Sequence, residues 1–184
     1  MVLPFEGTAE AVSDRKVNHQ CREHNNWSEY MDVTRTAILL LHPLLAVCLI
    51  YWLFKQHGWR ARGRSLKGEE RTNARDSHEL WGRRFLPAAL ITVSLAFIAQ
   101  MIRGMLDDKG WNAYLMPSVH GIFGILGIVL LVIMTNMGKR TAKARVDGES
   151  WTELKVRHGR AADIIIILMV LQGFLGFLYI FEVL

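Results

Sequence analysis

The sequence predicts an all-α integral membrane protein in which four transmembrane helices form an antiparallel bundle. Four apolar segments of about 20 residues, the length an α-helix needs to cross the hydrocarbon core, run through the chain. They lie at residues 36–54, 85–106, 115–138 and 161–184, and charged stretches separate them. Backbone groups in lipid must bond within their own segment, which favours helices over strands. The polar stretch 1–35 is predicted to be an N-terminal arm, outside the transmembrane domain of residues 36–184.

The first span has His42 near its start, followed directly by Pro43. The second apolar segment is preceded by His78, which joins the helix only if the helix begins within the charged stretch before it. Asp76 and Ser77 are good N-cap residue types, and the residues that follow tolerate helix. Pro87 lacks an amide donor and clashes one turn back, so a kink is expected there.

The third span has His120 near its start and the fourth contains no histidine but follows His158, so every span has one histidine close to its N-terminal end. Small residues follow at helical spacing in both spans. They are Gly121, Gly124 and Gly127 in the third span, and Gly173 and Gly176 in the fourth. Such glycines favour close packing of membrane helices, and they would equally leave room for a flat macrocycle. The spacing alone leaves both interpretations open.

Antiparallel topology predicts two histidine pairs, because alternate spans begin at the same face of the membrane. His42 and His120 belong to one face, and His78 and His158 to the other. Ionisable side chains at such depths are costly and usually functional, and paired imidazoles on neighbouring helices suit axial ligation of haem iron. The alternatives are an interhelical hydrogen bond for the first two histidines and an ordinary solvated position for the other two. One haem rather than two therefore stays open.

The net charge of +5 is concentrated in two stretches, residues 55–84 and 139–160. Topology places both on the same face, so the positive-inside rule predicts that these loops are cytoplasmic, or stromal or matrix-facing in an organelle. Both termini then lie on the opposite side. Because the charge sets the orientation in the membrane, it does not indicate a nucleic-acid partner. Arg84 and Arg157 lie near the second histidine pair and could meet haem propionates, although orientation explains them equally well.

Four sequence pieces together resemble a known family. They are His42-Pro43, His78 ahead of the second span, Ser118-Val119-His120-Gly121 with Gly124, and Arg157-His158-Gly159-Arg160. In order and spacing they resemble the cytochrome b-561 type of transmembrane di-haem electron carriers, over about residues 39–179. The larger family usually has six spans. This chain has only the four-helix core, and it looks closer to shorter bacterial and cyanobacterial relatives.

The resemblance implies two haem b groups, held by His42 with His120 and by His78 with His158, in a protein that passes electrons between the two membrane faces. Its partners would be the lipid bilayer and a small-molecule or protein electron donor and acceptor, with an anionic reductant such as ascorbate as one donor. An alternative is a structural or assembly subunit of a larger respiratory or photosynthetic complex, with or without a bound tetrapyrrole. A transporter has less support, because the spans show no broken-helix pair.

Overall fold

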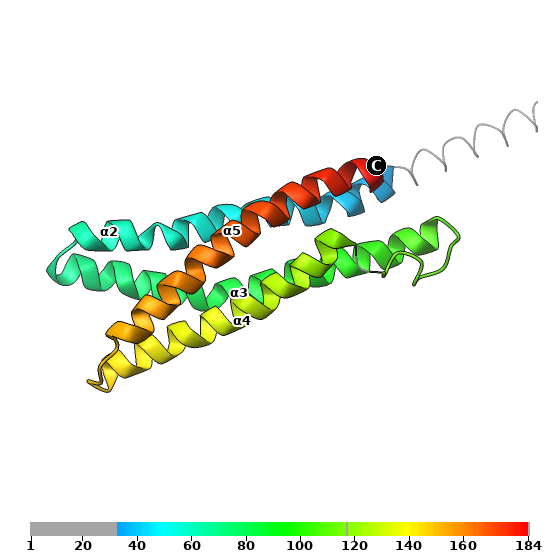
Figure 1. Ribbon diagram of the computed structural model, residues 1–184. Coiled ribbons are helices and arrows are strands. Elements are labelled where there is room, and N and C mark those ends of the chain that lie inside the picture. The colour runs from blue at the N-terminus through cyan, green and yellow to red at the C-terminus, as the bar shows by residue number, and fades with distance from the viewer. Residues whose placement is uncertain (1–32, 117, 184) are drawn as a thin grey trace, which may run out of the picture. The chain divides into compact units, whose positions relative to one another are not determined.

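The computed structural model describes residues 33–116 and 118–183, and within these residues every regular element is a helix (Figure 1). The helices are a first helix of residues 33–57, α2 (Trp59–Ser65), α3 (Gly68–Leu106), α4 (Val119–Val146) and α5 (Thr152–Val183). Among the described residues, four helical stretches are long and apolar enough to cross a membrane. The prediction of an all-α, four-helix membrane bundle is therefore confirmed.

The predicted N-terminal arm, residues 1–35, lies almost entirely outside the described residues. Only its last three positions are described, and they are helical. Residues 39–184 belong to one compact unit. All the contacts between helices that follow lie within this unit.

The helices extend well beyond the apolar segments, so the two predicted basic loops are mostly helical. The first of these stretches contains α2 and the start of α3, joined at residues 66–67, and the second is interrupted only at residues 147–151. α3 begins at Gly68, so the prediction of an N-cap at Asp76 or Ser77 was wrong. Glu69 and Glu70 favour this earlier start, because carboxylates stabilise the positive end of a helix. His78 consequently lies inside α3, which continues through Pro87.

The buried core is small and lies midway along the bundle. It consists of Leu49, Leu53, Phe85, Ala89, Leu131 and Ile165. Trp52 of the first helix packs edge-on against Phe85 and Trp81 of α3, with ring centroids 5.4 and 5.6 Å away. Many other large apolar side chains point outward, such as Ile167, which is 71% exposed. An apolar surface of this extent suits lipid and would promote aggregation in water.

The turn between α3 and α4 is compact, and it fixes where α4 begins. A Cβ atom on Gly104 would collide with the carbonyl oxygen of Gly110, so the turn folds directly onto the end of α3. Gly110 itself has a φ of 89°, which an L side chain rarely adopts. Ser118 then caps α4, because its hydroxyl oxygen accepts from the amide of Gly121 at 3.2 Å. This cap places His120 in the first turn of α4.

Candidate functional site: two histidine pairs

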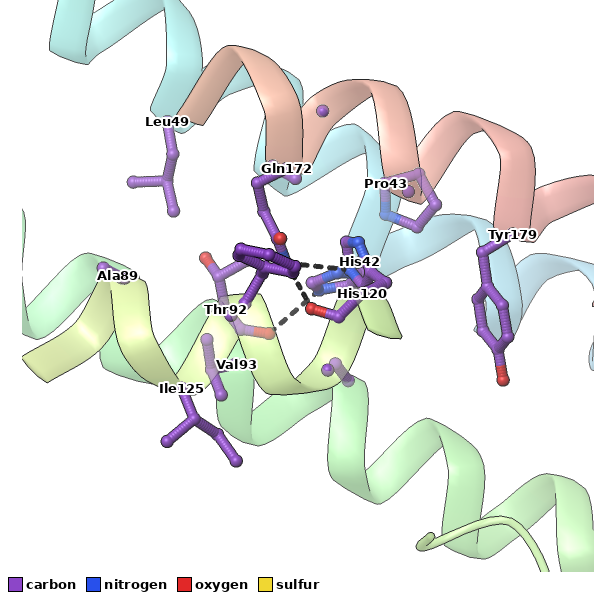
Figure 2. Close-up of a pocket in the computed structure, with 18 of the residues that line it drawn as sticks. His42, Pro43, Leu49, Ala89, Thr92, Val93, His120, Ile125, Gln172 and Tyr179 are labelled. Atoms are coloured by element: carbon purple, nitrogen blue, oxygen red, sulfur yellow. Dashed lines mark hydrogen bonds between the residues drawn. The ribbon is translucent and has the colours of Figure 1, made fainter. Parts of the chain in front are cut away.

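The structure places the four histidines side by side in two pairs, each joining helices that are not consecutive. In the first pair, the rings of His42 on the first helix and His120 on α4 have centroids 6.2 Å apart and planes at 78°. In the second pair, His78 on α3 and His158 on α5 have centroids 6.5 Å apart and planes at 75°. Figure 2 shows the rings of the first pair next to each other, close to Gln172 of α5.

The two pairs lie toward opposite ends of the bundle. The first pair lies toward the end that carries the α3–α4 turn, because His120 is in the first turn of α4. The second pair lies toward the end where α4 connects to α5, because His158 is in the second turn of α5. His42 reaches α3 at Thr92, whereas His78 lies much closer to the start of the same helix. At 1.5 Å per residue, these two positions on α3 are about 20 Å apart along the helix axis.

The spacing within each pair is that of an ordinary edge-to-face ring contact, and it would also admit one metal ion between the two imidazoles. A histidine nitrogen binds a transition metal at about 2 Å and lies about 1.1 Å from its ring centroid, so two such rings have centroids about 6 Å apart. The observed 6.2 and 6.5 Å agree with this value. A direct hydrogen bond between the rings is not formed in either pair. The geometry therefore fits an ion held between the two rings.

One histidine of each pair is anchored to the backbone of a neighbouring helix. His42 donates from Nδ1 to the carbonyl oxygen of Thr92 at 3.1 Å, and His158 donates from Nδ1 to that of Met134 at 3.2 Å. A carbonyl oxygen only accepts, so Nδ1 must carry the proton and Nε2 is left as the bare nitrogen. Metal-ligating histidines usually have such a partner, which fixes both the ring orientation and the tautomer.

The other histidine of each pair has no such anchor. The Nδ1 atoms of His78 and His120 are buried and lack a hydrogen-bond partner among the described residues. Each ring instead lies nearly parallel to an aromatic ring: His78 against Trp59 at 5.7 Å and 20°, and His120 against Tyr179 at 6.3 Å and 5°. Sequence reasoning missed both aromatic residues, because nothing in their spacing marks them as neighbours of a histidine.

A cavity of about 360 Å³ opens beside the first pair and is lined mostly by apolar side chains. Both His42 and His120 line it, together with Gln172 and Tyr179 of α5. Its volume lies within the range of ligand and cofactor sites, which is roughly 300 to 1,000 Å³. The Gln172 amide donates to the carbonyl oxygen of His120 at 2.8 Å and lies 3.4 Å from Nε2 of that ring.

The α3–α4 turn forms one wall of this cavity through Tyr114. The hydroxyl of Tyr114 donates to Asp107 at 2.8 Å and accepts from the ammonium of Lys109 at 3.0 Å. The second of these hydrogen bonds raises the pKa of Lys109. The guanidinium of Arg103 lies over the ring of Tyr114, 4.1 Å from its centroid. These contacts hold the turn against the end of α3, at the mouth of the first site.

Two glycines make room for the paired histidines themselves. A Cβ atom on Gly176 would lie 2.9 Å from Cε1 of His120, and one on Gly138 would lie 3.2 Å from Cε1 of His158. Gly138 was not among the predicted site residues. The predicted Gly124 lines the cavity, but a Cβ there would meet the amide of Gln172 at 3.1 Å. The room beside Gly124 is thus filled by a side chain of α5, as close helix packing predicts.

The two arginines predicted to lie near the second pair are exposed and have other contacts. Arg84 lies over the ring of Trp81, and Arg157 is paired with Glu153 one turn earlier on α5. A different basic residue reaches the vicinity of His158. Arg60 donates to the carbonyl oxygen of Gly159 at 3.2 Å and to Asp163 at 2.8 Å.

Each site brings together two imidazoles, which are transition-metal ligands. No group of three or more His, Cys, Asp or Glu side chains able to hold a metal ion occurs in residues 33–116 and 118–183. An ion between two of these rings would therefore find no third ligand of these four residue types. No family model, curated protein or solved structure matches the chain.

Proposed function

We propose that this protein is a membrane-spanning b-type cytochrome that passes electrons between the two faces of the membrane. The observation that carries the proposal is the pair geometry: two histidine pairs toward opposite ends of one bundle, with ring centroids 6.2 and 6.5 Å apart. His42 and His120 would hold one haem b, and His78 and His158 a second. The resemblance of the same four segments to the cytochrome b-561 type supports this assignment.

The number and type of protein ligands at each site favour haem over a structural zinc or copper ion. Structural zinc sites need four protein ligands, and each site here offers two imidazoles. A haem would bring the other nitrogen ligands of its iron, so two imidazoles at each site would be enough to hold it. The bare Nε2 atoms of His42 and His158 would be available to the iron, because the Thr92 and Met134 carbonyls hold both rings in the required tautomer.

The pairs also favour electron transfer over chemistry at the iron. When bound, haem supplies a reversible one-electron redox couple, and ligation by two histidines leaves no open coordination position. The protein would supply position, axial ligands and an apolar surrounding. The two sites are about 20 Å apart along α3, and the core residues Leu49 and Phe85 with Trp52 lie in the bundle between the two ends.

The orientation and partners form part of the proposal. The charged ends of the helices at the second pair would face the cytoplasm, or the stroma or matrix, by the positive-inside rule. Exposed Arg84 and Arg157 would add to a surface potential that attracts an anionic electron donor. The acceptor would bind at the first pair, beside the turn that carries Tyr114.

The experiment is a haem count on detergent-purified protein, by pyridine haemochrome and reduced-minus-oxidised spectra. Wild type is expected to carry two haems per chain, and His120→Ala and His158→Ala one each. His57→Ala is the matched control, because His57 is bonded to Asp163 and belongs to neither pair, so it should keep both haems. One haem in wild type would restrict the proposal to a single site. A complete absence of haem would overturn it and favour the structural-subunit alternative.

A further inference from the structure

Each pair has one histidine held at Nδ1 by a backbone carbonyl and one that lacks this bond, and of the latter two only His120 has another polar contact among the described residues, the Gln172 amide at 3.4 Å from Nε2. His42 and His158 are held through Nδ1 by backbone carbonyls, whereas His78 and His120 have a buried Nδ1 without a hydrogen-bond partner. A ligand ring that lacks this bond can rotate about its side-chain torsions. Some other contact must set its orientation if its Nε2 is to face the partner ring.

We infer that Trp59 and Tyr179 are positioning residues, which fix the rings of His78 and His120 by stacking. This inference rests on the proposed function. The Trp59 ring lies 20° from the plane of His78, and the Tyr179 ring lies 5° from the plane of His120. A near-parallel aromatic neighbour at these separations favours one orientation of the imidazole, because offset parallel rings attract each other.

The residues around Trp59 favour its position beside the His78 ring. Trp59 opens α2, and a Cβ atom on Gly63, one turn later, would lie 3.1 Å from its indole ring. The glycine therefore lets the indole lie flat along α2. At the other end, a Cβ on Gly176 would lie 2.9 Å from Cε1 of His120, so the imidazole is held between the α5 backbone and Tyr179.

The structure also offers a matched control for each positioning residue. Trp81 is three residues from His78, but its recorded partners are Trp52 and Arg84 rather than a paired histidine. Phe181 lies two residues from Tyr179 on α5, is exposed, and packs edge-on against Phe177. Replacement of either control residue removes aromatic area of similar size and leaves the stacked rings in place.

The test measures how fast each haem leaves full-length protein in detergent when an excess of a haem-binding acceptor protein is added. The His120→Ala variant should keep only the haem of the second pair, and His158→Ala only that of the first, so their spectra identify which haem is lost. Trp59→Leu should speed the loss of the His78–His158 haem alone by about tenfold, and Tyr179→Leu that of the His42–His120 haem alone. Trp59→Phe and Tyr179→Phe should restore slow loss, and Trp81→Leu and Phe181→Leu should match wild type. Equal acceleration at both sites, or none, overturns the inference.

A second measurement does not depend on haem. Diethyl pyrocarbonate modifies bare imidazole nitrogens, and peptide mass spectrometry gives the rate at His78 and His120 in protein produced without added haem. Trp59→Leu should raise the rate at His78 several-fold and leave His120 unchanged, and Tyr179→Leu should do the reverse. Unchanged rates in both variants contradict the positioning role. If wild type binds no haem, the proposed function fails, and this measurement still decides the inference.

Discussion

His158 on α5 donates from Nδ1 to the carbonyl oxygen of Met134 on α4, at 3.2 Å. Gly138, in the next turn of α4, leaves room for this contact, because a Cβ there would lie 3.2 Å from Cε1 of the imidazole. A backbone carbonyl and a missing side chain thus determine together which nitrogen of His158 is available and where it points.

Gly138→Ala is therefore expected to displace His158, and Gly176→Ala to displace His120 more strongly, because the clash at Gly176 is closer, at 2.9 Å. Overpacking of this kind costs about 1–3 kcal/mol, and each variant should lose or weaken one haem and keep the other. Gly127→Ala is the control, since its Cβ would lie 3.7 Å from Leu168, an ordinary contact. Haem content and reduced-minus-oxidised spectra give the result. Two full haems in Gly176→Ala would show that His120 can move without loss of ligation.

Gly124→Ala tests whether this glycine allows close packing of two helices or leaves room for the haem macrocycle. Its new methyl group would lie 3.1 Å from the amide of Gln172, so the single variant should be destabilised by about 1 kcal/mol. Gln172→Ala removes the amide that the new methyl group would meet, together with its 2.8 Å hydrogen bond to the His120 carbonyl. Alone, it should lower the free energy of unfolding by a similar amount. The double variant should then be more stable than the sum of the two effects predicts. If the double variant and Gly124→Ala both lose the first haem, the role of Gly124 is instead to leave room for the macrocycle. Thermal unfolding in detergent and haem content give the two readouts.

Glu79 and Arg145 join α3 to α4 through a half-buried ion pair of 3.0 Å, at the same end as the second histidine pair. Removal of either partner leaves a partly desolvated charge, so Glu79→Gln and Arg145→Gln should each cost about 1–2 kcal/mol, between the values for exposed and fully buried pairs. Glu153→Gln breaks an exposed pair with Arg157 on one helix, and the unfolding free energy should change by less than about 0.5 kcal/mol. A double-mutant cycle on thermal unfolding measures the coupling, and additive single effects would show that the pair contributes nothing.

Gly104→Ala tests the turn that forms a wall of the cavity. Its Cβ would collide with the carbonyl oxygen of Gly110, so the turn must move and take Tyr114 with it. Destabilisation of about 1–3 kcal/mol is expected, together with a spectral change at the first site alone. Gly82→Ala, whose Cβ has no neighbour within 4 Å, should instead stabilise α3 by about 0.5–1 kcal/mol. If the two substitutions affect thermal unfolding equally, the turn is not packed as described.

The sequence alone determined the fold class and the spans. Each apolar segment is long enough to cross a bilayer, and backbone groups within lipid can be satisfied only as helix or closed barrel. Direction alternates from span to span, so the sequence also assigned the four histidines to two ends. The extent of the helices was harder to predict. Lys, Arg and Glu are good helix formers, so the charged stretches that looked like loops continue as α2, α3 and α4 beyond the apolar segments.

Only the tertiary structure decided how each histidine is held. The Thr92 and Met134 carbonyls have no side-chain signature, and Trp59 and Tyr179 become neighbours of histidines only through the rotation and axial shift of each helix. Side-chain packing between helices sets the rotation and axial shift of each helix, and the length of an apolar segment does not predict either one. The roles of Gly138 and Gly176 have the same origin, because a glycine leaves useful room only where a partner side chain reaches it.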